Sequence, residues 1–155
     1  MEIQGLRLRR ARRRDIATVA AIEDASFPDP WKEEIFLEAL ECYGAAFFVA
    51  EYADRIVGFV TAALEDTGTE IYGHIMNIAV DHQFRSKGIG TKLVARIELE
   101  CLIAGATAMQ LEVRQSNRAA QEFYQRIGYQ QALTIAGYYA NGEDAVLMIK
   151  WFSIQ

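Results

Sequence analysis

A glycine-containing turn with two cations is the part of the sequence that most clearly indicates chemistry. An expected strand ends at Val80, and Arg85, Lys87, Gly88 and Gly90 follow before an expected helix. The first turn of a helix leaves backbone N–H groups without partners and carries the positive end of the helix dipole. Such a turn attracts anions, and the two cations favour a pyrophosphate over a neutral ligand. The pattern therefore predicts a phosphate-binding loop.

Two familiar phosphate motifs fit this turn poorly. A P-loop requires GxxxxGK followed by Ser or Thr, and residues 87–92 lack that spacing. A dinucleotide-binding fingerprint finds its first two glycines in Gly88 and Gly90, and Glu112 lies where a ribose-binding acid would be. However, Leu93 replaces the third glycine, and the turn follows an expected antiparallel meander. The P-loop interpretation therefore fails, and the dinucleotide interpretation is kept only as a poor alternative.

The elements that must position this turn follow from hydrophobic periodicity and turn residues. Strands are expected over residues 6–10, 46–52, 56–64, 71–80, 108–113, 129–138 and 145–151. Helices are expected from an Asp15 N-cap to about residue 27, over 31–42, from 89–91 to Gly105, and from an N-cap at Ser116 or Asn117 to residue 127. The order βααβββαβαββ predicts a mixed α/β (α+β) fold, with residues 1–155 forming a single domain.

Composition excludes several other classes of protein. The chain has 155 residues, of which 52% are apolar and 24% charged, as in one globular domain. No apolar run approaches the ~18 residues that a membrane span needs, and residues 1–5 do not resemble a secretory signal. Cys42 and Cys101 lie in no CxxC or metal-ligand spacing, so neither a disulfide framework nor a metal site is expected. These features predict a cytoplasmic protein without a membrane partner.

Basic residues are concentrated at the start of a chain whose formal net charge is −5. The cluster consists of Arg7, Arg9, Arg10, Arg12, Arg13 and Arg14. Such a cluster suits contact with nucleic acid or a ribosomal surface. It also suits a solvated strand edge and turn, which is the favoured interpretation. We expect no sequence-specific nucleic-acid binding, and association with the ribosome stays open.

Several segments resemble one enzyme family. The stretch 83–90 resembles the (Q/R)xxGxG/A acyl-CoA loop of the GNAT acetyltransferase superfamily, and the strand 77–80 before it matches in type. The segments 27–31, 111–114 and 137–145 resemble the RimI-type N-terminal acetyltransferases, including archaeal members. The resemblance covers nearly the whole chain. It implies a GNAT fold, with a mixed and mostly antiparallel sheet, and transfer of acetyl from acetyl-CoA to the N-terminal α-amine of a protein or peptide in a ternary complex.

The resemblance also implies which residues hold acetyl-CoA. Backbone groups of Ile78, Ala79 and Val80 would pair with the pantetheine and the acetyl carbonyl. The pyrophosphate would lie on the loop formed by Arg85, Ser86, Lys87, Gly88, Ile89, Gly90 and Thr91. Asn117 and Ala120 would contact the cofactor near the thioester. Tyr124 would protonate the departing thiolate, although it equally suits a half-buried core aromatic.

Acetyl transfer to an amine also needs a base. An α-amino group, with a pKa of about 7.7–8.0, is much easier to deprotonate than lysine at about 10.4, so one carboxylate suffices. The resemblance makes Glu112 the proton acceptor, either directly or through water, although it equally suits an ion pair with Arg114 or Arg118. The resemblance implies that His74 would share this task with Glu112 through water, although a single strand histidine is usually structural.

The substrate is the least determined part of the prediction. Asp29 is expected to face the incoming ammonium, although it also suits a capping residue beside two prolines. Tyr138 and Tyr139 are expected to line the peptide groove, or else to pack across strands. Acetylation of a lysine or a polyamine stays open, since Glu23, Asp24 and Asp29 suit a polycation. A non-catalytic CoA-binding module is the alternative from another class.

Overall fold

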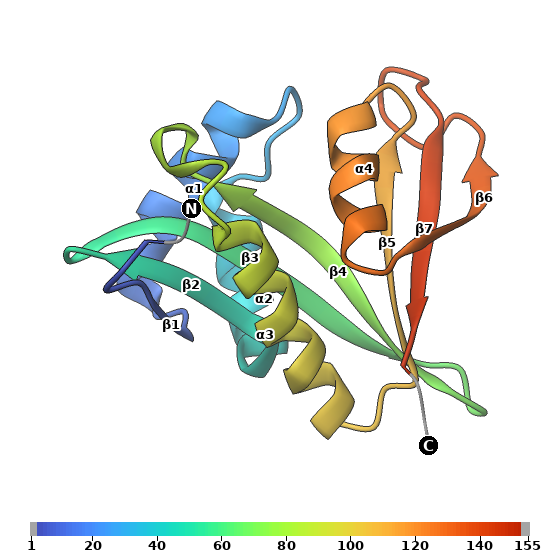
Figure 1. Cartoon of the computed structure of the whole chain (residues 1–155), viewed down its shortest axis with the longest axis horizontal. Coiled ribbons are helices and arrows are strands. Elements are labelled where there is room, and N and C mark those ends of the chain that lie inside the picture. The colour runs from blue at the N-terminus through green and yellow to red at the C-terminus, as the bar shows by residue number, and fades with distance from the viewer. Residues whose placement is uncertain (1–2, 153–155) are drawn as a thin grey trace.

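A seven-stranded sheet with helices on both faces forms the body of the computed structural model, which describes residues 3–152 (Figure 1). The strands are β1 (Arg7–Arg10), β2 (Phe47–Tyr52), β3 (Arg55–Asp66), β4 (Ile71–Val80), β5 (Ala108–Arg114), β6 (Gln130–Ile135) and β7 (Ala145–Trp151). The helices are α1 (Ile16–Ser26), α2 (Glu33–Tyr43), α3 (Ile89–Ile103) and α4 (Arg118–Arg126), together with the short 3-10 turns Arg13–Asp15, Gly44–Ala46 and His82–Phe84. This order confirms the predicted fold class.

The sheet has a core on each face because strand side chains alternate. Phe47 and Val49 pack with α1 and α2, whereas Phe48 and Ala50 pack in the core that includes α3 and Tyr124 of α4. The strand order is β1-β2-β3-β4-β5-β7-β6, and all neighbours are antiparallel except β4 and β5. The helices thereby fix the sheet from both sides.

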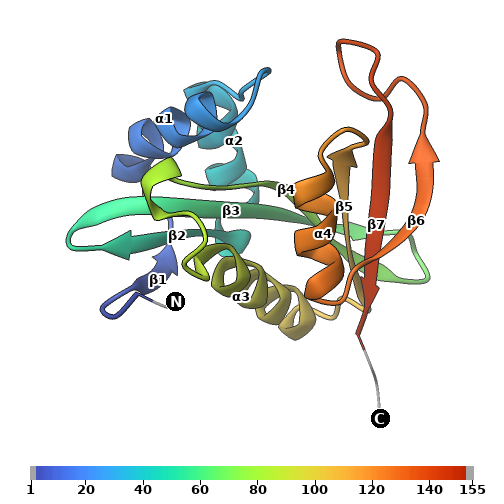
Figure 2. The ribbon, with the colours of Figure 1, turned by 45° about the horizontal axis from the view of Figure 1, so that its top comes forward.

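The parallel pair β4 and β5 separates after a short contact. Tyr72, Gly73 and His74 pair with β5, but the rest of β4 pairs only with β3. Figures 1 and 2 show the two strands meeting at one end and diverging toward the other. The sheet therefore opens along the second half of β4, as a fold must if a ligand is to lie between two strands.

A bulge at Met76 changes which way β4 points its side chains. Thr61 pairs with Asn77 whereas Ala62 pairs with Ile75, so Met76 is an extra residue in β4. Simple alternation would place Ile75 and Asn77 on one face. Instead Ile75 packs in the α3 core, while Asn77 reaches α1 on the opposite face. Bulges re-aim side chains in this way, often beside active sites.

The structure differs locally from the sequence prediction at three places. Helix α2 begins at Glu33 rather than residue 31, and β6 ends at Ile135 rather than residue 138. The Asp15 carboxylate does not cap α1, because it accepts hydrogen bonds from the Arg9 guanidinium and the Arg12 amide. Within residues 3–152, no helix is long and apolar enough to cross a membrane, and no three His, Cys, Asp or Glu side chains are grouped to hold a metal ion.

Candidate active site

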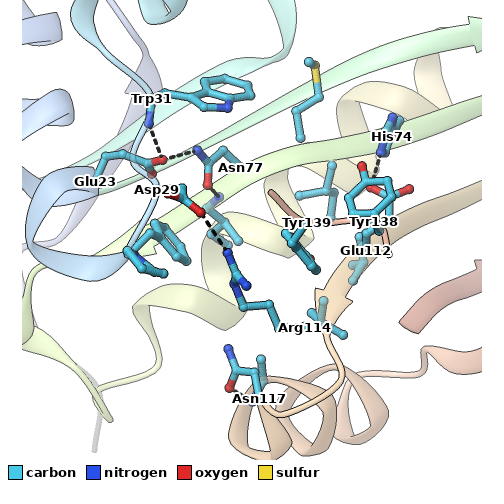
Figure 3. A pocket seen from close by; sticks show the side chains of 18 of the residues that line it. Glu23, Asp29, Trp31, His74, Asn77, Glu112, Arg114, Asn117, Tyr138 and Tyr139 are labelled. Atoms are coloured by element: carbon cyan, nitrogen blue, oxygen red, sulfur yellow. Dashed lines mark hydrogen bonds and ion pairs between the residues drawn. The ribbon is translucent and has the colours of Figure 1, made fainter. Parts of the chain in front are cut away.

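A cleft of about 470 Å³ lies where β4 and β5 separate (Figure 3). Its walls come from β4, β5, α4, the segment between α1 and α2, and the segment 136–144 before β7. Nine predicted site residues line it: Asp29, His74, Ile78, Glu112, Asn117, Ala120, Tyr124, Tyr138 and Tyr139. Segments far apart in the sequence therefore supply a single cavity.

Glu112 and His74 form a hydrogen-bonded pair in this cleft. The distance from His74 Nε2 to Glu112 Oε1 is 2.8 Å, and the two side chains are 19% and 14% exposed. Burial alone would lower the pKa of His74, but Glu112 and then Glu65 outweigh it, and the pKa is raised. The prediction that Glu112 and His74 act at one place is consistent with this geometry. Glu112 makes this bond rather than the alternative pairing with Arg114 or Arg118.

Strand register explains why these two side chains meet. His74 is the last residue of β4 that pairs with β5, and its partner is Gln110. Glu112 lies two residues beyond Gln110, so both β5 side chains project from the same face as His74. The pair therefore sits at the point where the strands begin to separate.

Tyr124 presents a buried phenol on α4. It is 6% exposed and its ring packs against Phe123 and Tyr129 at centroid distances of 5.0 and 5.6 Å. Burial raises the pKa of Tyr124, so the hydroxyl keeps its proton at neutral pH. A phenol in this state can donate a proton to a developing thiolate.

Asn117 and Ala120 define the start of α4 at the edge of the cleft. Asn117 Oδ1 accepts a hydrogen bond from the Ala120 amide at 3.1 Å, which confirms the predicted Asn117 N-cap. Because the oxygen is used for the cap, the amide nitrogen of Asn117 is left to face a ligand. The cap also fixes the first turn of the helix that carries Tyr124.

Arg114 joins two loops above the cleft, and the sequence did not reveal this role. Its guanidinium lies 3.3 Å from Asp29 Oδ2 and 3.1 Å from Glu143 Oε1, and it stacks 4.1 Å from the centroid of the Tyr139 ring. It also donates to Asn141 Oδ1 at 3.2 Å. Arg114 therefore connects the proline-containing segment that holds Asp29 to the segment 136–144 that holds Tyr139 and Glu143. Its positive charge compensates the negative charge of the Asp29 carboxylate.

Glu23 is a second cleft residue that the sequence did not assign to the peptide or cofactor site. Its Oε2 accepts hydrogen bonds from the Trp31 amide at 3.0 Å and from Asn77 Nδ2 at 2.8 Å. The residue is only 2% exposed, and burial raises its pKa although both donors oppose this. The available signal was its spacing, because it follows Ile16 and Val19 on the buried stripe of α1. An acid at such a position needs internal partners.

The predicted pyrophosphate loop, residues 85–91, comprises the turn before α3 and the first residues of that helix, and it lies outside the lining of the cleft. Ser86 and Gly88 have φ values of +63° and +82°, and the helix makes its first bond from the Lys92 amide to the Gly88 carbonyl. The preceding amides are thus directed out of the helix end, as in an anion nest. Arg85 instead ties the loop to its surroundings through the Val80 carbonyl at 3.1 Å and Ser26 Oγ at 3.2 Å. This backbone arrangement fits a pyrophosphate.

Comparison with known proteins agrees with this architecture. Residues 16–129 match the Acetyltransferase (GNAT) family. The chain belongs to the GNAT acetyltransferase family. An N-alpha-acetyltransferase of Sulfurisphaera tokodaii is 35% identical over 151 residues, covering 92% of this chain and 90% of the relative. A putative [ribosomal protein bS18]-alanine N-acetyltransferase of Bacillus subtilis is 33% identical over 151 residues, covering 95% of each.

A solved structure supports the same fold for this GNAT acetyltransferase. Ard1 from Thermoplasma volcanium has a TM-score of 0.90 at 24% identity, over 97% of this chain and 99% of that chain. The predicted family, fold and enzyme class are therefore confirmed. The individual roles of the predicted residues stay predictions.

The predicted site residues of this acetyltransferase lie in two places. The cleft brings together Glu112, His74, Tyr124 and Asn117 with the two tyrosines of segment 136–144. The loop 85–91 lies at the N-terminus of α3, beyond the end of β4. Ala79 packs its side chain in the α1–α2 core, so only its backbone is left for a ligand. Strand β4 therefore links the loop to the reaction chemistry.

Proposed function

We propose that residues 1–155 act as one catalytic domain that transfers the acetyl group of acetyl-CoA to the N-terminal α-amine of proteins or peptides. The observation that carries this proposal is the Glu112–His74 pair at 2.8 Å, which lies in one cleft with the protonated phenol of Tyr124. A base and an acid in one cleft are what amine acetylation requires.

Acetyl-CoA supplies the thioester that an amine attacks directly in the ternary complex. In our proposal the N–H groups before Lys92 bind its pyrophosphate. The edge of β4 at residues 78–80, which β5 leaves unpaired, binds the pantetheine; in this structure the Ile78 amide donates to Asn77 Oδ1 and the Val80 carbonyl accepts from Arg85. Asn117 and Ala120 lie beside the thioester, where the Asn117 amide nitrogen is available. Backbone donors on β4 polarise the acetyl carbonyl as charge develops on its oxygen.

Glu112 accepts the proton that the α-ammonium must lose, directly or through water, and His74 shares it across the 2.8 Å bond. An α-amine near pKa 8 gives up this proton near neutral pH more readily than a lysine. Tyr124 donates its proton to the departing sulfur: burial keeps the phenol protonated at neutral pH, and the proton moves as the C–S bond breaks and negative charge builds up on the sulfur. The nitrogen must lose two protons to become an amide: Glu112 takes the first, and the second, released after the attack, restores the phenol of Tyr124 once the phenol has protonated the sulfur. The products are a neutral amide and a thiol, and one proton is left on the Glu112–His74 pair.

The charges in the cleft favour a peptide over a polyamine. Asp29 is paired with Arg114, and Glu23 is buried with one oxygen bonded to Trp31 and Asn77. Two of the three acids that suit a polycation are therefore compensated or inaccessible. Tyr138 and Tyr139 line the cleft beside them and offer flat surfaces and hydroxyls to an extended peptide.

A substrate panel tests the proposal. CoA release is measured with peptides that have free or blocked N-termini, with spermidine and with an internal-lysine peptide, using wild type and Glu112→Gln. Glu122→Gln serves as the matched control, since Glu122 is exposed on α4. We expect turnover only on free N-termini and a strong loss only in Glu112→Gln. Turnover confined to spermidine or lysine, or acetyl-CoA binding without turnover on any amine, would contradict the proposal.

We further propose that the enzyme associates with the ribosome and therefore acts in the cytoplasm. Arg9 and Arg10 pair with Asp15 and Glu100, whereas Arg12, Arg13 and Arg14 are exposed together. An exposed basic turn would hold the enzyme near ribosomal RNA, close to ribosomal proteins or nascent chains. We expect salt-dependent cosedimentation with ribosomes that weakens when residues 12–14 are changed to glutamine. Unchanged cosedimentation would rule out this contact.

A further inference from the structure

Glu65 contacts the side of His74 that faces away from Glu112. The distance from Glu65 Oε2 to His74 Nδ1 is 2.9 Å, so the imidazole lies between two carboxylates. The other oxygen of Glu65 accepts a hydrogen bond from Gln110 Nε2 at 3.0 Å. Glu65 is thus held in one orientation by β5 while it reaches the histidine.

The three acidic and basic side chains form a row across three strands. Ala63 of β3 pairs with His74, and His74 pairs with Gln110 of β5. Glu65 lies two residues beyond Ala63, and Glu112 lies two residues beyond Gln110, so all project from the same face as His74. The row begins in the cleft and ends near the β3–β4 turn. Its exposed fractions rise accordingly, from 14% for Glu112 to 19% for His74 and 45% for Glu65.

Proton counting gives Glu65 a specific effect on His74. A neutral imidazole carries one N–H and one acceptor nitrogen, and the partner of one nitrogen decides the state of the other. A carboxylate at Nδ1 keeps the proton there, because it can only accept. Glu112 does the same at Nε2 while it is ionised, but Glu112 is the carboxylate that takes a proton from the amine, so the proton shared between Nε2 and Glu112 is the one that moves. When both nitrogens are protonated, the imidazolium donates to both carboxylates.

We propose that Glu65 is a positioning residue that keeps the Nδ1 proton of His74 in place, so that Nε2 exchanges its proton with Glu112. The negative charge of Glu65, like that of Glu112, also sets how tightly the His74–Glu112 pair holds the proton taken from the amine. This inference rests on the proposed role of that pair in acetyl transfer. It gives a task to a surface glutamate that touches neither substrate.

The surroundings of His74 make Glu65 an effective partner. Two charged groups face it, Glu65 from β3 and Glu112 from β5, and Tyr138 of segment 136–144 lies near both carboxylates. Gln110, the remaining neighbour in the row, is neutral. Isolated surface ion pairs contribute little, but here a mostly buried imidazole is the shared partner and Gln110 fixes the carboxylate.

Titration of His74 in Glu65→Gln tests the inference directly. The chain has only two histidines, so His82 provides an internal reference in the same NMR spectrum. Glutamine keeps a hydrogen-bond acceptor for Nδ1 but removes the charge. We therefore expect a lower pKa for His74 and an unchanged titration of His82. Glu65→Asp is expected to restore part of the shift, because the charge returns on a shorter side chain.

Kinetics connect this titration to turnover. In Glu65→Gln we expect the acid limb of the kcat/KM profile to move to lower pH, together with the His74 pKa. The plateau value is expected to fall about three- to tenfold, because a less basic pair removes a proton less effectively. The KM for acetyl-CoA and the thermal unfolding midpoint stay unchanged. Glu70→Gln is the matched control: it lies on the same hairpin and makes the same charge change, but Glu70 bonds Tyr72.

Two results would overturn the inference. The first is a His74 pKa in Glu65→Gln that equals the wild-type value or moves only as much as in Glu70→Gln. The second is a lowered pKa with an unmoved acid limb, since the His74 proton would then not take part in turnover. The titration uses the enzyme without substrates. Therefore, failure of wild type to acetylate any free N-terminus would refute the proposed function, while the titration would still decide whether Glu65 controls His74.

Discussion

Two carboxylates on opposite sides of the same cleft have contrasting environments. Glu23 is 2% exposed; one of its oxygens takes two donors, while Oε1 is buried without a partner among the described residues. Glu112 is more accessible and bonds a histidine that a second carboxylate holds in turn (Figure 3). The first arrangement fixes backbone and amide groups, and the second can move a proton.

The difference shows how this fold divides stability and chemistry between its two sheet halves. Glu23 ties the segment after α1 to Asn77 at the bulge of β4, where helices cover the sheet and β4 stays paired with β3 on both sides of the bulge. Glu112 lies across the gap on β5, which pairs with β4 over only three residues. A rigid wall therefore faces a wall that carries titratable side chains. Each prediction below tests this assignment.

The largest effect is expected from Glu112→Gln. The variant keeps an oxygen that can accept a hydrogen bond from His74 but loses the capacity to take a proton, so kcat should fall about 10²- to 10⁴-fold. Acetyl-CoA affinity and the unfolding transition should stay at wild-type values. Steady-state kinetics with a free N-terminal peptide and calorimetry of acetyl-CoA binding measure both. A loss below threefold would remove Glu112 as the base.

Glu23→Ala should instead reduce stability. The Trp31 amide and the Asn77 amide would be left buried without their acceptor, which costs about 2–4 kcal/mol in the free energy of unfolding. Urea denaturation measures this cost. If Glu23→Ala unfolds like wild type but loses turnover, Glu23 belongs to the chemistry and the comparison fails.

Glu23→Gln separates the hydrogen bonds from the charge. Glutamine keeps the accepting oxygen, so we expect a change within about 1 kcal/mol. The folded pKa of Glu23 is raised above its unfolded value, so its contribution to stability is present below the unfolded pKa and is lost as pH rises through the folded pKa. Glutamine does not ionise, so Glu23→Gln does not lose stability in this way as pH rises. The variant should therefore gain relative to wild type as pH rises from acidic to neutral, in denaturation series at several pH values.

Arg114→Ala should change substrate affinity more than chemistry. The variant releases Asp29 and Glu143 from each other and removes the cation from the Tyr139 ring. We expect the KM for the peptide to rise about tenfold with little change in the KM for acetyl-CoA, since ion pairs and cation–π contacts at this exposure contribute about 1 kcal/mol each. Arg114→Lys keeps the charge but cannot bridge both acids. It should show an intermediate KM, and equal KM values for both variants and wild type would contradict the loop-bridging role.

The same comparison shows what the sequence can predict. Hydrophobic periodicity and turn residues give the element order, and residue types narrow the cap of α4 to Ser116 or Asn117, of which the structure shows Asn117. The bulge at Met76 has no glycine or proline to announce it, so the turn of Asn77 toward α1 appears only in the structure. Arg114 acquires its partners from segments about 85 and 29 residues away in sequence. Contacts of this kind depend on tertiary packing, which local patterns do not encode.

The smallest effect is expected from Cys101→Ala, which tests whether an acetyl-enzyme forms on this thiol. Cys101 is 1% exposed on α3, and burial, followed by the charges of Glu100 and Glu98, raises its pKa to about 11. A side-chain carbon at Gly73 would lie 2.8 Å from its sulfur, so the thiol packs on the face of β4 opposite to that of His74. The thiol therefore neither ionises near neutral pH nor reaches the cleft.

We expect kcat within about twofold of wild type and a loss of about 1 kcal/mol in stability. Complete loss of turnover, with the fold and acetyl-CoA binding intact, would contradict direct attack by the amine.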